Sequence, residues 1–223
     1  MCLGVLALPT SGQDDFTRER ERMVELQIEA RGVHDPHTLS AVRRVPRHLF
    51  VPPSRRADAY ADSPLPIGFG QTISQPYIVA YMTESISPDS TFRVLEVGTG
   101  SGYQAAVLAE VVDSVFSVEI IPELFAAAGA RLSSLGYTNA VTRCADGYFG
   151  WEEKAPFDAI VVTAAADHIP PPLVRQLKDG GTMVIPVGSP FLVQSLLLVK
   201  RHGEQIQTKN LMPVRFVPLT RGD

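Results

Sequence analysis

The chain has few cysteines and no long apolar segment. Only two of its 223 residues are cysteine, which excludes the disulfide framework of a small secreted protein. Apolar runs such as residues 191–199 are far shorter than the roughly 20 residues that a membrane-spanning helix needs. We therefore expect a cytoplasmic protein that does not bind membranes.

The chain also has no excess of positive charge. It carries 20 lysine and arginine residues against 24 aspartate and glutamate residues, for a formal net charge of −4. That balance argues against a broad nucleic-acid-binding surface. Hydrophobic residues make up 45% of the sequence, which is enough for a sizeable core, and at this length we expect one domain.

Two kinds of catalytic site are missing as well. The sequence has no G-x-S-x-G elbow and no Ser-His-Asp arrangement, so nothing indicates a serine nucleophile activated by a base. His34, Asp35 and His37 stand close together, but Asp35 followed by proline is better explained as the start of a helix than as a metal site. We expect no bound metal.

What the chain does have is a glycine-rich turn at the end of a strand. Apolar residues 93–97 lead into Gly98, Gly100 and Gly102, and a helical segment follows at 103–111. Glycine lacks a Cβ atom, so the turn can be tight and a ligand can approach the backbone closely. The helix N-terminus adds free N–H groups. The spacing is G-x-G-x-G, which differs from the G-x-G-x-x-G of dinucleotide sites.

Acidic residues follow the next two predicted strands. Glu119 ends the strand at 114–119, where a carboxylate can accept hydrogen bonds from both hydroxyls of a ribose. Asp146 follows the strand at 140–144 and can accept a bond from an adenine amino group. The plainer alternatives are a solvated glutamate and an ordinary Asp-Gly turn. Because open α/β sheets bind ligands at the carboxyl ends of strands, the joint pattern favours a nucleoside site.

From residue 92 onward, strand and helix patterns alternate, which predicts the fold class. We expect an α/β fold: a Rossmann-like, doubly wound, mostly parallel sheet with an antiparallel end, preceded by N-terminal helices. Residues 55–70 are predicted to be a long irregular segment, which compact domains keep mainly for a site. The predicted strands are 93–97, 114–119, 140–144, 157–162, 182–187, 191–200 and 205–211; the predicted helices are 14–31, 36–42, 76–86, 102–111, 122–135 and 170–177.

A second motif precedes the sheet at residues 65–77. Two glycines are followed by the hydroxyl side chains of Thr72 and Ser74, and then by Pro76 at the start of a helix. Backbone N–H groups at a helix N-terminus, together with nearby hydroxyls, can hold an anion. The alternative is purely structural, because Ser74 is also a good N-cap residue for the helix that follows.

The layout of roughly residues 75–200, with its glycine turn and strand-terminal acids, resembles the class I S-adenosylmethionine-dependent methyltransferases. The loop at 65–77 is similar to that of one family within this class, the protein-L-isoaspartate O-methyltransferases. Segments outside the shared core carry the same resemblance, which runs from about Met23 to Leu219. These segments are residues 47–52, 158–166, 177–181 and 214–219.

The resemblance implies roles for particular residues. Ser74 takes the position of the family's active-site serine, and the implied cofactor is S-adenosyl-L-methionine, with S-adenosyl-L-homocysteine as its product. The implied cofactor-binding residues are Thr72, Gln75, Glu96, Gly98, Gly100, Gly102, Glu119, Asp146, Gly147 and Thr163. The implied substrate-binding residues are Gly70, Thr72, Ser74 and Val214.

The resemblance also implies a domain organisation. Residues 1–12 have no family counterpart, and we expect an N-terminal tail there. Residues 13–223 would then be a single methyltransferase domain. Within it, residues 13–75 would form a helical and loop cap that carries the substrate loop, and residues 76–223 the cofactor-binding sheet and tail.

The implied reaction is methyl transfer to the free α-carboxylate of L-isoaspartyl residues in damaged proteins or peptides, which begins repair through a succinimide. A carboxylate with a pKa of about 4 is already ionised at neutral pH, so no general base is needed. We expect a monomer that binds such peptides and no nucleic acid. One alternative is a methyltransferase of RNA or DNA bases, but residues 162–166 offer no stacking aromatic. The other is a nucleoside-binding module without activity.

Overall fold

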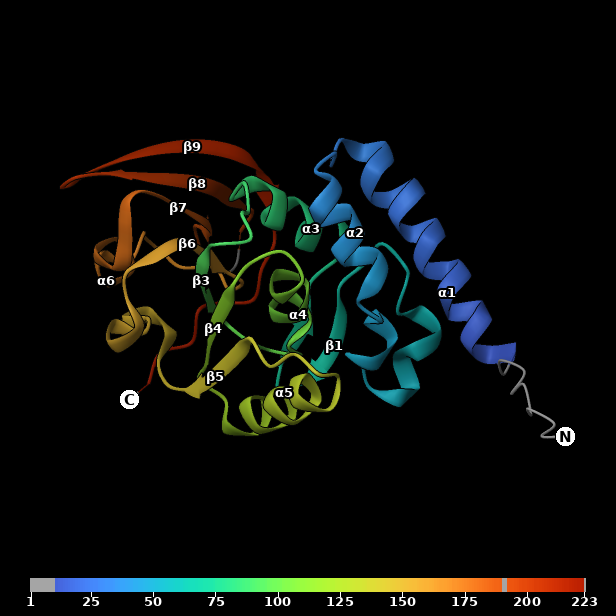
Figure 1. The fold of residues 1–223 in the computed structure, drawn as a ribbon. Helices are drawn as coiled ribbons and strands as arrows, with labels where there is room; N and C mark the ends of the chain where they lie inside the picture. The colour runs from blue at the N-terminus through green and yellow to red at the C-terminus, as the bar shows by residue number, and fades with distance from the viewer. Residues whose placement is uncertain (1–10, 190–191, 223) are drawn as a thin grey trace, which may run out of the picture.

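A seven-stranded sheet forms the centre of the structure, a computed structural model that describes residues 11–189 and 192–222 (Figure 1). The strand order is β5-β4-β3-β6-β7-β8-β9, parallel from β5 to β7 and antiparallel at β8 and β9. The predicted fold class is therefore confirmed. The strands are β3 (Arg93–Val97), β4 (Ser114–Glu119), β5 (Ala140–Cys144), β6 (Phe157–Val162), β7 (Leu177–Val187), β8 (Gln194–His202) and β9 (Gln205–Val214).

The order in which the chain visits the strands reverses between β3 and β6. From β3 the chain moves outward to β4 and β5, and then returns to place β6 on the other side of β3. Val97 and Val162 end these two strands in register with each other. Open α/β sheets bind ligands in the crevice that such a reversal creates, so the turns that follow Val97 and Val162 define the expected site.

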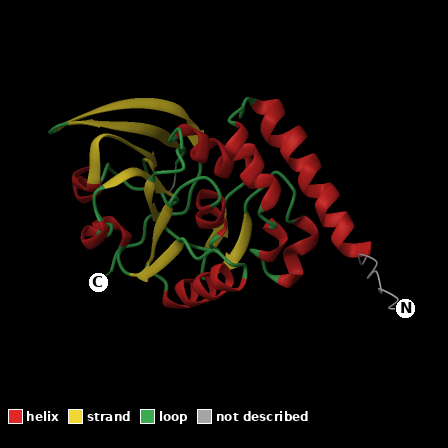
Figure 2. Cartoon of the chain, viewed as in Figure 1, coloured by secondary structure: helices red, strands yellow, loops and turns green. Residues whose placement is uncertain are grey.

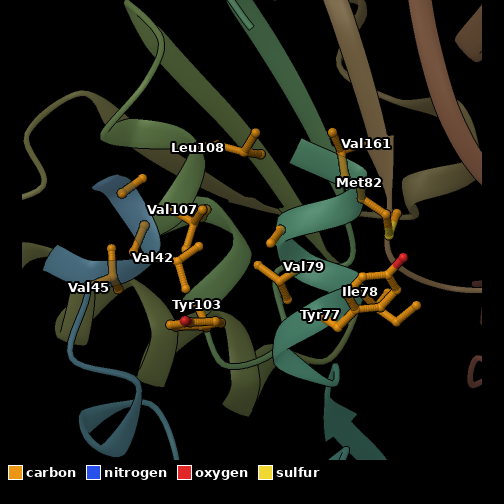
Figure 3. Close-up of a cluster of buried hydrophobic side chains, with 14 of the residues drawn as sticks. Val42, Val45, Tyr77, Ile78, Val79, Met82, Tyr103, Val107, Leu108 and Val161 are labelled. Carbon is orange, nitrogen blue, oxygen red and sulfur yellow. The ribbon is translucent and has the colours of Figure 1, made fainter. Parts of the chain in front are cut away.

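Helices cover both faces of the parallel strands, because those strands are apolar on both sides. Val94 and Val161 belong to one buried cluster with α2, α3 and α4, whereas Leu95 and Ile160 belong to a second cluster with α6. Figure 3 shows the first cluster, in which side chains of α3 and α4 point toward one another. The helices are α2 (Pro36–Arg44), α3 (Pro76–Ser85), α4 (Tyr103–Ala109), α5 (Pro122–Ser134) and α6 (Pro171–Gln176).

The N-terminal helix α1 (Ser11–Met23) lies on the side of the molecule away from β8 and β9 (Figures 1 and 2). The predicted helix at 14–31 continues beyond it as a π-helical turn (Val24–Ile28) and a 3₁₀ turn (Glu29–Arg31). Helix α1 is held by aromatic packing, since the rings of Phe16 and His48 stack with their centroids 4.1 Å apart.

The prediction of an irregular segment at 55–70 is wrong for half of its length, residues 55–58 and 65–68. The structure has a 3₁₀ helix (Pro53–Asp58) and an antiparallel hairpin of β1 (Leu65–Gly68) and β2 (Gln71–Ile73). These strands are too short to give a clear alternating pattern. Their register is set by packing, because Leu65 and Ile73 are paired and both buried.

The bounds of the three C-terminal strands also differ from prediction. Strand β7 begins at Leu177, where a helix was predicted, and passes through a bulge before residue 182. Gly180 has a φ of +78° in this stretch, which is why the sequence there is typical of a turn. Strand β8 begins at Gln194, and β9 continues to Val214. The predictions for residues 1–10 and 190–191 lie outside the described residues.

None of the helices in the described part of the chain combines the length and the apolar composition that crossing a bilayer requires.

Candidate functional site

The glycine turn after β3 has a backbone that requires glycine. Gly98, Gly100 and Gly102 have φ values of +96°, +51° and +85°, a region that side chains with a Cβ rarely adopt. A Cβ atom on Gly98 would lie 2.5 Å from Thr163 Oγ1. The turn is tied to the neighbouring strand, because the Gly98 N–H donates to the carbonyl of Val118 at 2.8 Å.

Thr163 follows β6 and closes the crevice from the other side. Its Oγ1 lies 2.6 Å from the Gly98 carbonyl oxygen and 3.0 Å from that of Val97, to which its own N–H also donates. The hydroxyl thus fixes the distance between the two turns at the point where the strand order reverses. The structure therefore brings Gly98 and Thr163 together, as expected of residues that share a site.

Glu119 lies at the end of β4 with its carboxylate buried beside the glycine turn. Its side chain is 5% exposed, Oε2 accepts from the Gly100 N–H at 2.8 Å, and Oε1 accepts from the Ile121 N–H at 2.9 Å. Each oxygen therefore keeps acceptor capacity after binding one backbone donor. The orientation of this carboxylate is fixed before any ligand arrives.

These residues line a cavity at the carboxyl ends of β3, β4 and β6, which we call the donor cavity. Its opposite wall is the C-terminal segment at residues 217–220. The sequence predicts residues 214–219 as part of a clamp for an extended peptide substrate, whereas in the structure residues 217–219 of this stretch line the donor cavity. The lining residues are Gln71, Thr72, Gly98, Gly100, Val118–Ile121, Gly147, Thr163, Ala164 and Val217–Thr220.

Of the predicted pair Asp146 and Gly147, only Gly147 lines this cavity, and Asp146 precedes it in the chain. A Cβ atom on Gly147 would lie 2.5 Å from Val97 Cγ1. The Asp146 carboxylate is already engaged: Oδ1 accepts from the Tyr148 N–H at 2.9 Å, and Oδ2 accepts from Arg221 Nε at 3.0 Å and from the Gly222 N–H at 3.1 Å.

A second cavity, the acceptor cleft, adjoins the first. Thr72 and Thr163 line both cavities, so the two spaces meet at these side chains. Two arginines and no carboxylate line the acceptor cleft among the described residues. Its lining residues are Arg31, Pro64, Thr72, Ser74, Gln75, Ile78, Thr163, Val193 and Met212–Val217.

Ser74 lies in this cleft, and the structure does not use it as a helix cap. The N-cap position of α3 is Gln75, and no side chain caps the helix there. Within the described residues no hydrogen bond to the Ser74 hydroxyl is present. The structural alternative for Ser74 is therefore wrong, and its half-buried hydroxyl is available to a ligand.

Not every predicted residue lines a cavity. Gly70 and Gly102 shape the two turns that carry the site, because both have positive φ values. Glu96 is fully buried under the glycine turn, where its carboxyl hydrogen bonds with Ser117, which in turn contacts Thr99 Oγ1 at 2.6 Å. Direct contact of Glu96 with a ligand stays a prediction.

Burial raises the pKa of Glu96 to about 8, with the charge of Glu119 acting in the same direction and the Ser117 hydrogen bond opposing it. Because the folded-state pKa lies above the ordinary value of 4.5, the folded protein binds a proton more tightly than the unfolded chain. Stability is thus lost as pH rises from the ordinary pKa toward the folded one.

Replacing Glu96 with glutamine should therefore stabilise the protein at alkaline pH. We expect the melting temperature of Glu96→Gln to exceed that of the unchanged protein by more at pH 8.5 than at pH 5, because the amide carries no charge to bury. Thermal unfolding across this pH range measures the effect. Glu204→Gln in an exposed turn is the matched control, and curves that run parallel for both variants would contradict the expectation.

The described residues contain no group of three or more histidine, cysteine, aspartate or glutamate side chains that could hold a metal ion.

Comparison with known proteins identifies relatives along nearly the whole chain. The model of the protein-L-isoaspartate(D-aspartate) O-methyltransferase family matches residues 18–223. The chain is 56% identical over 214 residues to protein-L-isoaspartate O-methyltransferase 2 of Shewanella sediminis, covering 96% of this chain and 88% of that protein. It is 57% identical over 205 residues to the protein-L-isoaspartate O-methyltransferase of Opitutus terrae, covering 92% and 88%.

Solved structures show the same fold. A protein-L-isoaspartate O-methyltransferase superposes with a TM-score of 0.81 at 31% identity, covering 89% of this chain and 65% of that longer one. A beta-aspartate methyltransferase from Plasmodium falciparum, in complex with S-adenosyl-L-homocysteine, has a TM-score of 0.77 at 24% identity and covers 91% and 99%. At that identity the second likeness concerns the fold alone.

Proposed function

This chain belongs to the protein-L-isoaspartate(D-aspartate) O-methyltransferase family and methylates L-isoaspartyl residues of proteins with S-adenosylmethionine, and we propose that the donor cavity and the acceptor cleft are the two halves of its active site. The observation that carries this assignment is that Thr72 and Thr163 line both cavities. A group passed from one cavity to the other would cross between these two side chains.

The donor cavity suits S-adenosylmethionine. The glycine turn exposes backbone without side chains, and the Glu119 carboxylate keeps acceptor capacity for two ribose hydroxyls. When bound, this cofactor supplies a positively charged sulfonium that activates its methyl group. Gly98, Gly100, Gly147 and Thr163 then set the position of the donor.

The acceptor cleft suits an anionic group on a peptide. Arg31 and Arg215 line it. Arg31 is paired with Asp62 at 2.6 Å, whereas Arg215 has no ion-pair partner among the described residues, so the Arg215 charge attracts an ionised acceptor. We propose that the Ser74 hydroxyl donates to the α-carboxylate of the isoaspartyl residue and orients it. Thr72 and Val214 line the part of the cleft that this residue would occupy. Because the acceptor is already ionised, the chain has to align the reactants and exclude water, and no base is required.

Tritium transfer from labelled S-adenosylmethionine to a matched pair of peptides tests the proposed function. The pair differs only in whether one aspartate is joined through its side chain or through its α-carbonyl. We expect labelling of the isoaspartyl peptide alone, because its free α-carboxylate is one methylene closer to the branch point. Equal labelling of both peptides, or labelling of nucleic acid instead, would overturn the proposal.

Replacing the Glu119 carboxylate with a neutral amide should selectively weaken cofactor binding. A charged hydrogen bond contributes about 1.5–3 kcal/mol, so we expect Glu119→Gln to raise the Kd for S-adenosylhomocysteine by about tenfold or more. Calorimetry measures this Kd, with Glu123→Gln at the exposed start of α5 as the control. Unchanged affinity in Glu119→Gln would show that the ribose does not contact this carboxylate.

The remaining predictions concern partners and location. We propose a monomer that acts in the cytoplasm on isoaspartyl proteins and does not bind nucleic acid. The net charge of −4 supports the last point. We also propose one methyltransferase domain at 13–223 with a cap at 13–75. The contacts of α2 and α3 with α4 in one buried cluster support a single unit.

A further inference from the structure

The C-terminal residues cross the donor cavity and are fastened at two points. At the first, the Ala165 N–H donates to the Val217 carbonyl and the Leu219 N–H donates to the Ala165 carbonyl, both at 2.8 Å. At the second, Asp146 accepts from Arg221 and Gly222. Residues 217–220 line the donor cavity, with Val217 and Leu219 at the first point and Thr220 between the two. We call residues 217–222 the strap.

Arg221 makes the most specific contacts of the strap. Its guanidinium donates to Asp146 Oδ2 at 3.0 Å and lies 3.7 Å from the centroid of the Tyr148 ring, which adds a cation–π contact. The Asp146 side chain is only 14% exposed, so the ion pair is partly shielded from water. Burial alone would raise the pKa of Asp146, but the hydrogen bonds from Tyr148, Arg221 and Gly222 hold it below its ordinary value.

The strap also limits how Asp146 can bind a ligand. Oδ2 already accepts two hydrogen bonds, from Arg221 Nε and from the Gly222 N–H, whereas Oδ1 accepts only one, from Tyr148. A carboxylate oxygen has two lone pairs, so an amino group that approaches Asp146 can be accepted by Oδ1 alone. Arg221 thereby selects the oxygen that faces the ligand.

We propose that Arg221 is a positioning residue for cofactor binding, which closes the adenine end of the donor cavity by fastening the strap to Asp146. This inference rests on the proposed donor cavity. The ligand of that cavity would be an S-adenosyl compound with a free adenine amino group. Releasing Arg221 loosens the wall at Thr220, whereas Val217 and Leu219 stay bonded to Ala165. Because Val217 is the strap residue that also lines the acceptor cleft, the cleft is left unchanged.

Calorimetry with S-adenosylhomocysteine on three full-length variants tests the strap. Arg221→Gln removes the charge and Arg221→Lys keeps it without the planar fork, while Lys200→Gln removes an exposed charge on β8 as a matched control. We expect Arg221→Gln to raise the Kd about tenfold through faster dissociation, Arg221→Lys to raise it less, and Lys200→Gln to leave it unchanged.

Steady-state kinetics supply the second readout. The KM for S-adenosylmethionine should rise in Arg221→Gln, while the KM for the isoaspartyl peptide and the kcat at saturating cofactor stay within about twofold of the unchanged protein. An unchanged Kd would overturn the strap proposal, and tighter binding would show instead that Arg221 competes with the ligand for Asp146. Absence of S-adenosylhomocysteine binding in the unchanged protein would overturn the donor cavity itself.

Discussion

Replacing Gly98 with alanine is expected to reduce methyl transfer by about 100-fold or more. The added Cβ would lie 2.5 Å from Thr163 Oγ1, well inside van der Waals contact, and the residue would keep a φ of +96°. Either the Thr163 hydroxyl must rotate and lose its contacts with the Val97 and Gly98 carbonyls, or the glycine turn or the end of β6 must move by about 1 Å. A displacement of that size between reacting groups commonly costs about 10²-fold in rate. Single-turnover kinetics on the isoaspartyl peptide measure the loss.

Gly136→Ala separates backbone strain from the steric clash. Gly136 has a φ of +83° just beyond α5, and a Cβ there would meet nothing within 4 Å. The Gly136→Ala variant should therefore have slightly lower stability and an unchanged rate of methyl transfer. In the double variant Gly98→Ala with Thr163→Ala, the clashing hydroxyl is gone, and activity above that of Gly98→Ala alone is expected. Full activity in the single Gly98→Ala variant would show that the turn is not part of the site.

Ser74→Ala is expected to lower kcat by about 100-fold while the Kd for S-adenosylhomocysteine stays nearly unchanged. The Ser74 hydroxyl lies in the acceptor cleft without a protein partner among the described residues, so its loss removes a donor to the acceptor carboxylate and little else. Removing one positioning donor of this kind typically costs about 10²-fold or more in rate.

Ser85→Ala, at the other end of α3, is the matched control for Ser74. The Ser85 hydroxyl donates to the Tyr81 carbonyl at 2.7 Å. This variant therefore removes a serine hydroxyl from α3 without changing the lining of the acceptor cleft. We expect Ser85→Ala to retain its kcat. If Ser74→Ala instead kept full activity and only melted earlier, a structural role for the hydroxyl would be established.

Four parallel strands were predictable because each is a short run rich in apolar or β-branched residues, and β3 also leads into a glycine while β4 ends at an acid. Residues 93–97, 114–119, 140–144 and 157–162 are strands with the predicted bounds. The β1–β2 hairpin was not predictable, since it depends on long-range packing of Leu65 and Ile73. Tertiary contacts of this kind override local patterns.

The candidate site was also predictable only in part. The sequence predicted the glycines and Glu119, because backbone turns and strand ends leave a local signature. It did not predict that Glu96 would lie beneath the turn, or that Arg221 would reach Asp146, 75 residues earlier in the chain. Such contacts arise only when distant segments meet, and no local spacing encodes them.

The β8–β9 hairpin offers a place to attach a reporter. Strand β8 begins at Gln194, which is paired with Val214 of the acceptor cleft, and runs to His202. At about 3.3 Å per residue, the turn at Gly203 and Glu204 therefore lies roughly 25 Å from the cleft. Both turn residues are exposed, and exposed loop tips tolerate insertion well. A fluorophore or a short peptide tag placed there would report on the protein in cells while leaving both ends of the chain, including the strap, as they are.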